Sequence, residues 1–402
     1  MVIKPKIKGF ICTTAHPKGC LMNVEAQIKR VQLQSKIDNH SKINNVLVVG
    51  GSTGYGLASR IVSSFGLGAN TYNVCLERPP KEGRTASPGW YNTAFFEKKA
   101  IECSFGAQTI IGDCFSDETK NEAIKLIKKD KVKINMVIYS VASPKRVDPE
   151  SGTIYKSSLK PIGRSVESVT INPNTAELSK VNIDPAPQEE IENTIKVMGG
   201  EDWKRWIDFL EKANVLSDGF LTFSYSYMGP EITQSIYRQG TIGQAKLDLE
   251  KTAQLITDNN QKNGKAIVVV NKALVTHASS AIPILPLYVC ILYKVMKEKN
   301  CHEDCLDQID RFLRNKVKWN LENSFEMDDN QMIRMDDLEM SKDVQSEVKR
   351  RWDNIEKDLE NADLSLIDQE GYLSDFLKLF GFGMDLDYEE DVSEMVEIQK
   401  VF

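Results

Sequence analysis

The stretch NVLVV at residues 45–49, followed by GGSTGYG at 50–56, decides the fold. The first five residues form a short valine-rich run of the kind found in buried strands. The next seven hold four glycines, and residues 55–65 then have the pattern of a helix. Glycine lets the backbone approach a pyrophosphate closely, and the helix N-terminus supplies amide donors and the positive end of the helix dipole. The stretch therefore predicts a strand–turn–helix unit that binds a dinucleotide.

Strands and helices alternate along most of the chain. Beyond the first strand, we expect strands at 71–77, 108–111, 134–140, 220–225 and 266–270. We expect further helices at 118–129, 201–213, 242–258, 285–299, 303–316 and 342–359. Such alternation is typical of a parallel sheet covered by helices on both faces. The predicted fold class is α/β, a Rossmann-type doubly wound parallel sheet in a single large domain that spans residues 1–402.

Three segments fall outside this alternation and are predicted as additions to the sheet. Residues 1–44 form an N-terminal add-on that packs against the nucleotide-binding part. Residues 148–200 form an inserted excursion, which begins with a stretch rich in proline, serine, threonine and asparagine and has room for a small hairpin. Residues 280–402 form a mainly helical C-terminal extension.

The composition is that of an ordinary globular protein, with 41% hydrophobic and 27% charged residues among 402. Its 51 basic and 57 acidic residues are mixed along the chain and give a net charge of −6. No arm or tail concentrates the positive charge that binding to a phosphate backbone requires. The composition therefore excludes nucleic acid as an expected partner.

No segment has the length expected of a membrane span or a signal peptide. The most apolar stretch, residues 281–296, contains two prolines and is shorter than the ~20 residues that a spanning helix needs. We interpret it as a buried or pocket-lining helix, with shallow membrane contact as the alternative. Eight cysteines without a CxxC pair favour reduced thiols in the cytoplasm.

The glycines, counted from Gly50, follow the spacing G-x-x-x-G-x-G, the version used by short-chain dehydrogenases and reductases. Glu77 lies 21 residues after Gly56, where a carboxylate can accept hydrogen bonds from ribose hydroxyls and repel a 2′-phosphate, which favours NADH over NADPH. The alternative, NADPH, stays open because Arg78, the next residue, could contact a 2′-phosphate. The predicted cofactor contacts of the turn and the strand ends are Gly50, Gly51, Ser52, Thr53, Gly54, Tyr55, Leu76, Glu77, Asp113, Cys114, Val141 and Ala142.

A tyrosine and a lysine form the second candidate group, in the stretch YMGPEITQSIYRQGTIGQAK at 227–246. Short-chain reductases use a tyrosine phenol to hydrogen-bond a substrate carbonyl and a lysine to hold the nicotinamide ribose, usually four residues apart on one helix face. Tyr237 and Lys246 are nine residues apart, or about 900° at about 100° per residue, which puts them on opposite faces of a regular helix. Gly240 and Gly243 lie between them. We therefore predict that Tyr237 precedes the helix of Lys246 or sits across a break in it.

Together these motifs resemble the FabV-type enoyl-acyl-carrier-protein reductases and the related trans-2-enoyl-CoA reductases. The Tyr–Lys spacing is one of the features that support the resemblance. The resemblance extends over nearly the whole chain. Other matching motifs are GFICTTAHPKGC at 9–20, GWYN at 89–92, GDCFSDE at 112–118, YSVASP at 139–144, VMGGEDW at 197–203, GTIGQAK at 240–246, NKALVTHASSAIPILPLY at 271–288 and KVMKEK at 294–299. The departures are modest: Cys114 stands where alanine is common, and Ser87-Pro88 varies a nearby loop.

The resemblance implies a reductase of trans-2-enoyl thioesters in fatty acid biosynthesis, with NADH as the hydride donor and enoyl-CoA or enoyl-acyl carrier protein as the substrate. It implies that Tyr237 is the catalytic donor, Tyr227 a second tyrosine in the substrate site and Lys246 a cofactor ligand. It also implies that Leu274, Val275 and Thr276 contact the nicotinamide end, that the helix at 284–294 binds substrate, and that the protein is a monomer.

Two other functions stay open at the level of sequence. A carbonyl or 3-ketoacyl reductase would use the same tyrosine with a serine about a dozen residues before it, and Ser224 and Ser226 are available. A regulator that kept the fold but lost catalysis would be expected to lose Tyr237 or Lys246. We predict no metal site, because Cys12, His16 and Cys20 give only three local ligands and the group Cys301, His302 and Cys305 is a poor complement.

Overall fold

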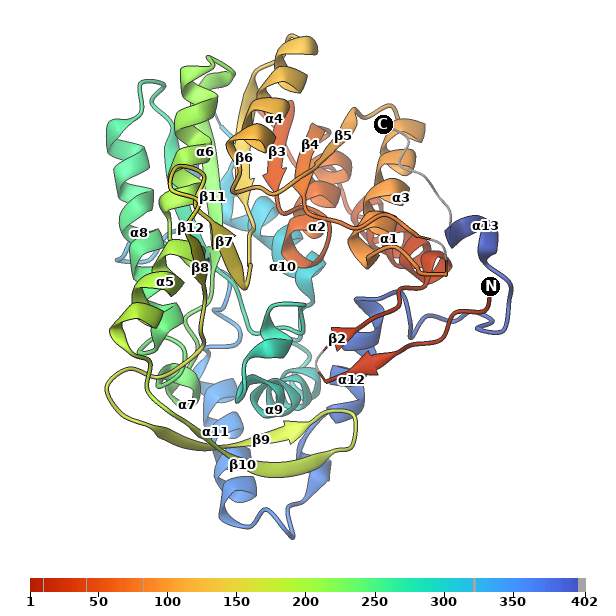
Figure 1. The fold of residues 1–402 in the computed structure, drawn as a ribbon, viewed down its shortest axis with the longest axis vertical. Helices are drawn as coiled ribbons and strands as arrows, with labels where there is room; N and C mark the ends of the chain where they lie inside the picture. Colours follow the sequence, from red (N-terminus) through yellow and green to blue (C-terminus); the bar gives the residue numbers. More distant parts are fainter. Residues whose placement is uncertain (10, 41, 82, 321–322, 397–402) are drawn as a thin grey trace.

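The computed structural model describes residues 1–9, 11–40, 42–81, 83–320 and 323–396. Phe10 of the motif at 9–20 and the last six residues of the predicted C-terminal extension lie outside them. Within the described chain one sheet holds seven parallel strands in the order β15-β12-β11-β6-β3-β4-β5 (Figure 1). The strands are β3 (Asn45–Val49), β4 (Asn70–Cys75), β5 (Ala107–Ile111), β6 (Ile134–Tyr139), β11 (Leu216–Ser226), β12 (Lys265–Val270) and β15 (Ile333–Arg334).

The strand order reverses between β3 and β6, which makes the sheet doubly wound and confirms the predicted fold class. In such sheets ligands bind at the carboxyl ends of the strands beside the reversal. The glycine turn directly follows β3, so it lies at that point. The sheet therefore brings the predicted cofactor contacts to one edge.

Alternation along the strands builds a separate core on each face of the sheet. Val46 and Val48 of β3 pack in one core with α1 (Pro17–Gln32), α2 (Gly54–Ile61) and α10 (Cys305–Arg311). Leu47 and Val49 point the other way, because successive side chains of a strand alternate, and share the second core with the opposite helices. Those helices are α4 (Asp117–Lys129), α6 (Glu201–Lys212) and α8 (Thr241–Asn259). Trp203 and Trp206 lie fully buried in this core, as a packing stripe.

Two predicted helices divide into an α-helix and a π-helical turn. The helix expected at 55–65 is α2 followed by η1 (Val62–Gly66), and the helix expected at 303–316 is α10 followed by η3 (Phe312–Lys316). A period of 3.6 in apolar residues does not distinguish these turns, since a π-turn adds one residue locally. The second strand ends at Cys75, two residues before the predicted end, so Leu76 and Glu77 begin the loop after it.

The N-terminal segment packs against helices that cover the sheet. Its helix α1 begins with Pro17, and His16 caps it by accepting a hydrogen bond from the Gly19 amide at 3.2 Å. The helix packs against α3 (Pro88–Glu102), which the sequence analysis did not predict, and against α2. A short hairpin, β1 (Ile7–Lys8) and β2 (Ile11–Cys12), precedes it.

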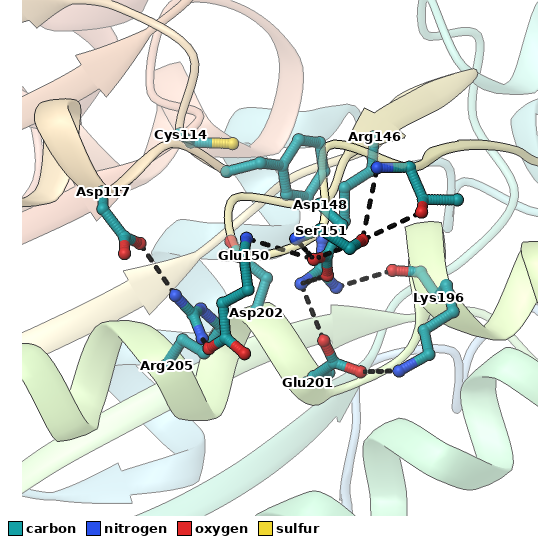
Figure 2. A network of polar contacts seen from close by, with 12 residues as sticks. Cys114, Asp117, Arg146, Asp148, Glu150, Ser151, Lys196, Glu201, Asp202 and Arg205 are labelled. Carbon is teal, nitrogen blue, oxygen red and sulfur yellow. Dashed lines mark hydrogen bonds and ion pairs between the residues drawn. The ribbon is translucent and has the colours of Figure 1, made fainter.

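The segment from Lys145 to Met198 contains two hairpins and a helix, and its first strand precedes residue 148, the predicted start of the excursion. The hairpins are β7–β8 (Lys145–Val147 and Ile154–Lys156) and β9–β10 (Val166–Asn172 and Glu177–Ile183), and the helix is α5 (Gln188–Met198). Figure 2 shows how the first hairpin is anchored: buried Arg146 donates to Glu201 at 2.7 Å and to the Lys196 carbonyl at 2.8 Å. The excursion is therefore fixed to the layer of α6.

Within the C-terminal segment, the helices α9 (Leu285–Glu298), α11 (Lys342–Lys357) and α12 (Gln369–Lys378) form a layer below the strand ends (Figure 1), whereas α10 packs on the sheet and β15 belongs to it. The centre of this layer is α9, which is buried on nearly all sides and packs against α11, α12 and β9. One face of α11 is part of this core, because Val348, Trp352 and Ile355 are buried in it. In the described chain, no helix combines the length and apolar character needed to cross a membrane.

A buried ion pair holds the layer of α4 and α6 together and supplies a test of the fold. Lys120 and Asp202 are both buried, with the Lys120 Nζ 2.8 Å from the Asp202 Oδ1. Lys120→Met leaves the carboxylate uncompensated, so we expect a loss of about 3–5 kcal/mol in the free energy of unfolding by urea. The exposed Lys125 of the same helix is the control, and Lys125→Met should change stability by less than about 0.5 kcal/mol. Equal effects of the two changes would contradict the prediction.

Candidate active site

A cavity of about 1140 Å³ lies at the carboxyl ends of the central strands. Most of the predicted site residues line it, although they come from segments far apart in sequence. These residues are Gly50, Ser52, Thr53, Gly54, Tyr55, Leu76, Glu77, Asp113, Cys114, Val141, Ala142, Tyr227, Tyr237, Lys246 and Thr276. Gly51, Leu274 and Val275 lie behind the lining, and the last two are buried in the core around α9.

The glycine turn is shaped for close approach of a ligand to its backbone. Gly50 has φ +91°, and a Cβ there would lie 2.1 Å from the Ser140 carbonyl oxygen. Gly54 has φ +52° at the first position of α2, and a Cβ there would meet only the Thr276 Cγ2, at 3.9 Å. Gly54 lines the cavity and begins α2, whose first-turn amides have no acceptor within the helix. The turn therefore fits the pyrophosphate of a dinucleotide.

Glu77 is held in place rather than solvated at the strand end. Its Oε1 accepts a hydrogen bond from the Ser52 hydroxyl at 2.6 Å, and its Oε2 accepts one from Ser87. Burial raises the pKa of the Glu77 carboxyl, while the two hydroxyls and Arg78 lower it. A carboxylate fixed next to the turn retains lone pairs for ribose hydroxyls.

The wall formed by Asp113 and Cys114 is supported from behind. The buried ammonium of Lys120 donates to the Cys114 carbonyl at 2.7 Å and the Phe115 carbonyl at 3.1 Å. Trp206 Nε1 donates to the same Cys114 carbonyl at 3.1 Å. The two carbonyls therefore turn away from the cavity, and the Lys120–Asp202 pair fixes the side of the crevice next to β5.

The predicted break between Tyr237 and Lys246 is confirmed. Helix α8 begins at Thr241 with Gly240 as its cap, so Tyr237 lies in the turn before it. At Gly243 a Cβ would lie 2.0 Å from the Arg238 carbonyl oxygen and 2.6 Å from that of Tyr237. Only glycine allows this approach. It lets the Tyr237 segment fold onto the first turn of α8, and both side chains then line one cavity.

The electrostatic surroundings of the two groups differ. Burial lowers the pKa of Lys246 to about 8, and its Nζ donates to the Tyr225 carbonyl at 3.2 Å. Burial raises the pKa of Tyr237 above its usual range, and the carboxylate of Glu339 adds to this. Among the described residues the Tyr237 hydroxyl has no hydrogen-bond partner, so its proton is free for a ligand. The Tyr227 ring meets the Tyr237 ring edge-on, with centroids 4.6 Å apart.

Sequence reasoning missed several residues at the cavity. Lys272 and Asn271 follow β12, line the cavity and are 2% exposed. Burial lowers the pKa of Lys272 to about 8, and its Nζ donates to the Glu303 carbonyl at 3.3 Å. Their position in the sequence could have indicated a place at the cavity, because both residues follow a predicted strand and come shortly before the predicted cofactor contacts at 274–276. Residues 1–4 and 11–14 also line the cavity, which nothing in their sequence indicates.

The described residues contain no group of three or more metal-ligating side chains. His16, one of the three local ligands considered, caps α1 through Nδ1 and meets the Phe382 ring edge-on at 5.8 Å. It therefore has a packing role at the junction of the N- and C-terminal segments.

Three family models match consecutive parts of the chain. Residues 2–82 match the NAD(P)H binding domain of trans-2-enoyl-CoA reductase, and residues 84–318 match its catalytic region. Residues 327–392 match a model described as an enoyl reductase FAD binding domain. The whole range 327–392 is described, and within it only Phe380 lines the large cavity, while α11 and α12 pack against α9. The residues of this range therefore do not fit a flavin site.

Curated relatives match over the whole chain. The enoyl-acyl-carrier-protein reductase [NADH] of Flavobacterium johnsoniae is 49% identical, with 100% of both chains covered. The trans-2-enoyl-CoA reductase [NADH] of Ruminiclostridium cellulolyticum is 48% identical, again with 100% of both covered. The crystal structure of Treponema denticola trans-2-enoyl-CoA reductase in complex with NAD is 44% identical, has a TM-score of 0.92 and covers 98% of each chain. With its doubly wound sheet, its glycine cradle and its separated tyrosine and lysine, this chain belongs to the family of NADH-dependent enoyl-acyl-carrier-protein and trans-2-enoyl-CoA reductases.

Proposed function

We propose that the protein reduces the C2=C3 double bond of trans-2-enoyl thioesters, with NADH as the reductant. One observation carries the proposal. The free hydroxyl of Tyr237 shares a cavity with the glycine turn and Lys246. A substrate carbonyl beside the phenol and a dinucleotide on the turn would then lie next to each other.

The cofactor contacts follow from the lining of the cavity. Gly50 to Tyr55 would hold the pyrophosphate, Glu77 the adenosine ribose and Lys246 the nicotinamide ribose. When bound, NADH supplies the hydride that adds to the β-carbon of the enoyl group. Gly51, Leu274 and Val275 would contribute by supporting the residues in front of them.

The residues of the chain would stabilise the charge that this addition creates. The thioester oxygen becomes an enolate, and the Tyr237 hydroxyl donates a hydrogen bond to it in a buried site, where such a bond is worth more than in water. A phenol is protonated at neutral pH, and burial raises the pKa of Tyr237 further, so the donor proton is retained. The α-carbon then takes a proton, from Tyr237 or from water, which completes the saturated acyl thioester.

A carbonyl or 3-ketoacyl reductase is the alternative on this fold. It would need a serine beside the phenol, and of the two candidates Ser226 lines the cavity whereas Ser224 does not. NADH oxidation with crotonyl-CoA, with acetoacetyl-CoA and without an acceptor separates the possibilities. We expect turnover with crotonyl-CoA only. Turnover with acetoacetyl-CoA alone would favour the alternative, and none with either would favour a regulator.

We further propose that the protein is a single-domain monomer that acts in fatty acid biosynthesis in the cytoplasm. The resemblance to the family supports the monomer and the pathway. All eight cysteines are free thiols, which suits a reducing compartment. Rates on matched enoyl-CoA and enoyl-carrier substrates would identify the carrier.

Replacement of the catalytic phenol is the direct test. Tyr237→Phe removes the proposed donor to the enolate, so kcat should fall about 10²–10³-fold, as when one oxyanion donor is lost. The Kd for NADH, measured by fluorescence titration, should change less than about 2-fold, because the ring remains. A variant that turns over at the wild-type rate would refute the role of Tyr237.

The alkaline pH profile tests Lys246. Its ammonium is charged below its pKa of about 8 and neutral above it, and only the charged form donates three hydrogen bonds to a ribose. We therefore expect kcat/KM for NADH to fall as the pH rises through about 8. Lys246→Met should lower kcat/KM and abolish this fall, which is the alkaline limb of the pH profile.

Lys272 is the matched control for this profile, since it lines the same cavity with a pKa also near 8. Lys272→Met should keep the alkaline limb. If the fall in kcat/KM above pH 8 disappears in Lys272→Met but persists in Lys246→Met, the fall is caused by Lys272, and the prediction for Lys246 is wrong.

Cofactor preference tests Glu77. Glu77→Gln keeps hydrogen bonds with Ser52 and Ser87 but removes the charge that repels a 2′-phosphate, and Arg78 remains beside it. The ratio of kcat/KM for NADPH to that for NADH should rise about 10-fold, or about 1.4 kcal/mol. The exposed Ile101, which does not line the cavity, is the control, and Ile101→Ala should leave the ratio unchanged. An unchanged ratio in Glu77→Gln would contradict this role.

A further inference from the structure

A buried carboxylate, Glu339, lies behind the two tyrosines of the site. It is 0% exposed and comes from the segment just before α11, more than a hundred residues away from either tyrosine. Its Oε1 accepts hydrogen bonds from the hydroxyls of Tyr227 at 3.0 Å and Tyr288 at 2.6 Å. Its Oε2 accepts one from the Ala273 amide at 2.7 Å. Three donors therefore converge on one side chain.

These donors belong to three different parts of the fold. Tyr227 directly follows β11, Ala273 lies in the loop after β12, and Tyr288 lies in α9. An ionised carboxylate suits such a junction because it only accepts hydrogen bonds and has about four lone-pair positions. Burial raises the pKa of Glu339, whereas the hydrogen bond from Tyr288 and the nearby Lys272 ammonium lower it. The anion thus has a counter-ion within the same core.

The contact determines what Tyr227 can do. A phenol has one proton, and Tyr227 donates it to Glu339, so the same proton is not available to a substrate oxygen. The Tyr227 ring is then fixed edge-on against Tyr237, with an interplanar angle of 84°. Tyr237, by contrast, has no hydrogen-bond partner among the described residues.

We propose that Glu339 is a positioning residue of the reaction: it captures the Tyr227 hydroxyl, fixes the Tyr227 ring as a brace for Tyr237, and leaves Tyr237 as the phenol that donates to the thioester oxygen. This inference rests on the proposed function. It changes the part expected of Tyr227 from a second tyrosine in the substrate site to a support for Tyr237.

A double-mutant cycle tests the coupling. Glu339→Gln retains the shape of the side chain, but its amide group cannot accept from all three donors, since one end now donates. We expect kcat with crotonyl-CoA to fall about 10-fold for Glu339→Gln, because a small misplacement of a catalytic group is costly. Tyr227→Phe should have a similar effect. The double variant should match Tyr227→Phe within about 2-fold, because residues that act as a unit are not additive.

Two further measurements separate positioning from general loss of structure. The Kd for NADH should stay within about 2-fold in all variants of the cycle. Ile355→Ala is the stability control, because Ile355 is buried in α11, makes no hydrogen bond with its side chain and does not line the cavity. It should lower the melting temperature and leave kcat unchanged. If Glu339→Gln does not fold, Glu339→Asp enters the same cycle with the same expectation.

The experiments distinguish failure of the Glu339 proposal from failure of the proposed function. Effects that multiply to about 100-fold in the double variant, or a Glu339 variant with wild-type kcat, would overturn the role of Glu339 even if Tyr237→Phe is inactive. A Tyr237→Phe enzyme with normal turnover would instead remove the proposed donor itself. Coupled effects together with an inactive Tyr237→Phe support both.

Discussion

The contact between Gly243 and the carbonyls of Tyr237 and Arg238 is the constraint on which the site depends. A side chain at 243 would overlap both carbonyls, at 2.6 and 2.0 Å. Without this approach the turn before α8 could not fold back onto the helix. Nine residues of continuous helix would then separate the phenol from the lysine by half a turn. The wide spacing in sequence and the glycine are therefore two parts of one solution, which brings a donor and a cation into one cavity by breaking the helix between them.

Two buried charges near the cavity have compensating partners within the protein. Lys120 pairs with Asp202 at 2.8 Å behind the wall of Asp113 and Cys114. Glu339 has three hydrogen bonds and the nearby Lys272. Charges buried in this way cost desolvation energy, so they are weak evidence for stability. Their effect is to orient carbonyls and hydroxyls before a ligand arrives. Orientation of this kind lowers the reorganisation that the reaction would otherwise require.

The sequence was most informative where local geometry and chemistry coincide. The strand at 45–49, its glycine turn and the break before α8 could all be predicted, because each depends on residues that are close in the chain. The predictions were weaker for contacts that only the folded chain creates. Glu339 lies in the acidic run DDLEM at 336–340, which resembles a solvated surface, and only the packing of α11 against α9 buries it. The N-terminal hairpin reaches the cavity for a similar reason, and a pattern of period 3.6 could not show the π-turns that end α2 and α10.

The position of Glu339 also explains why the C-terminal layer belongs to the catalytic unit. The sheet alone supplies the cradle, the phenol and the lysine, since these follow β3 and β11 or lie in α8. The hydroxyl of Tyr227, which also follows β11, would have no buried acceptor without the segment before α11. A phenol in that state would turn toward the cavity and compete with Tyr237 for the substrate oxygen. The layer of α9 and α11 therefore contributes more than apolar cover. By removing one of two adjacent hydroxyls from competition, it defines which proton donor the substrate meets.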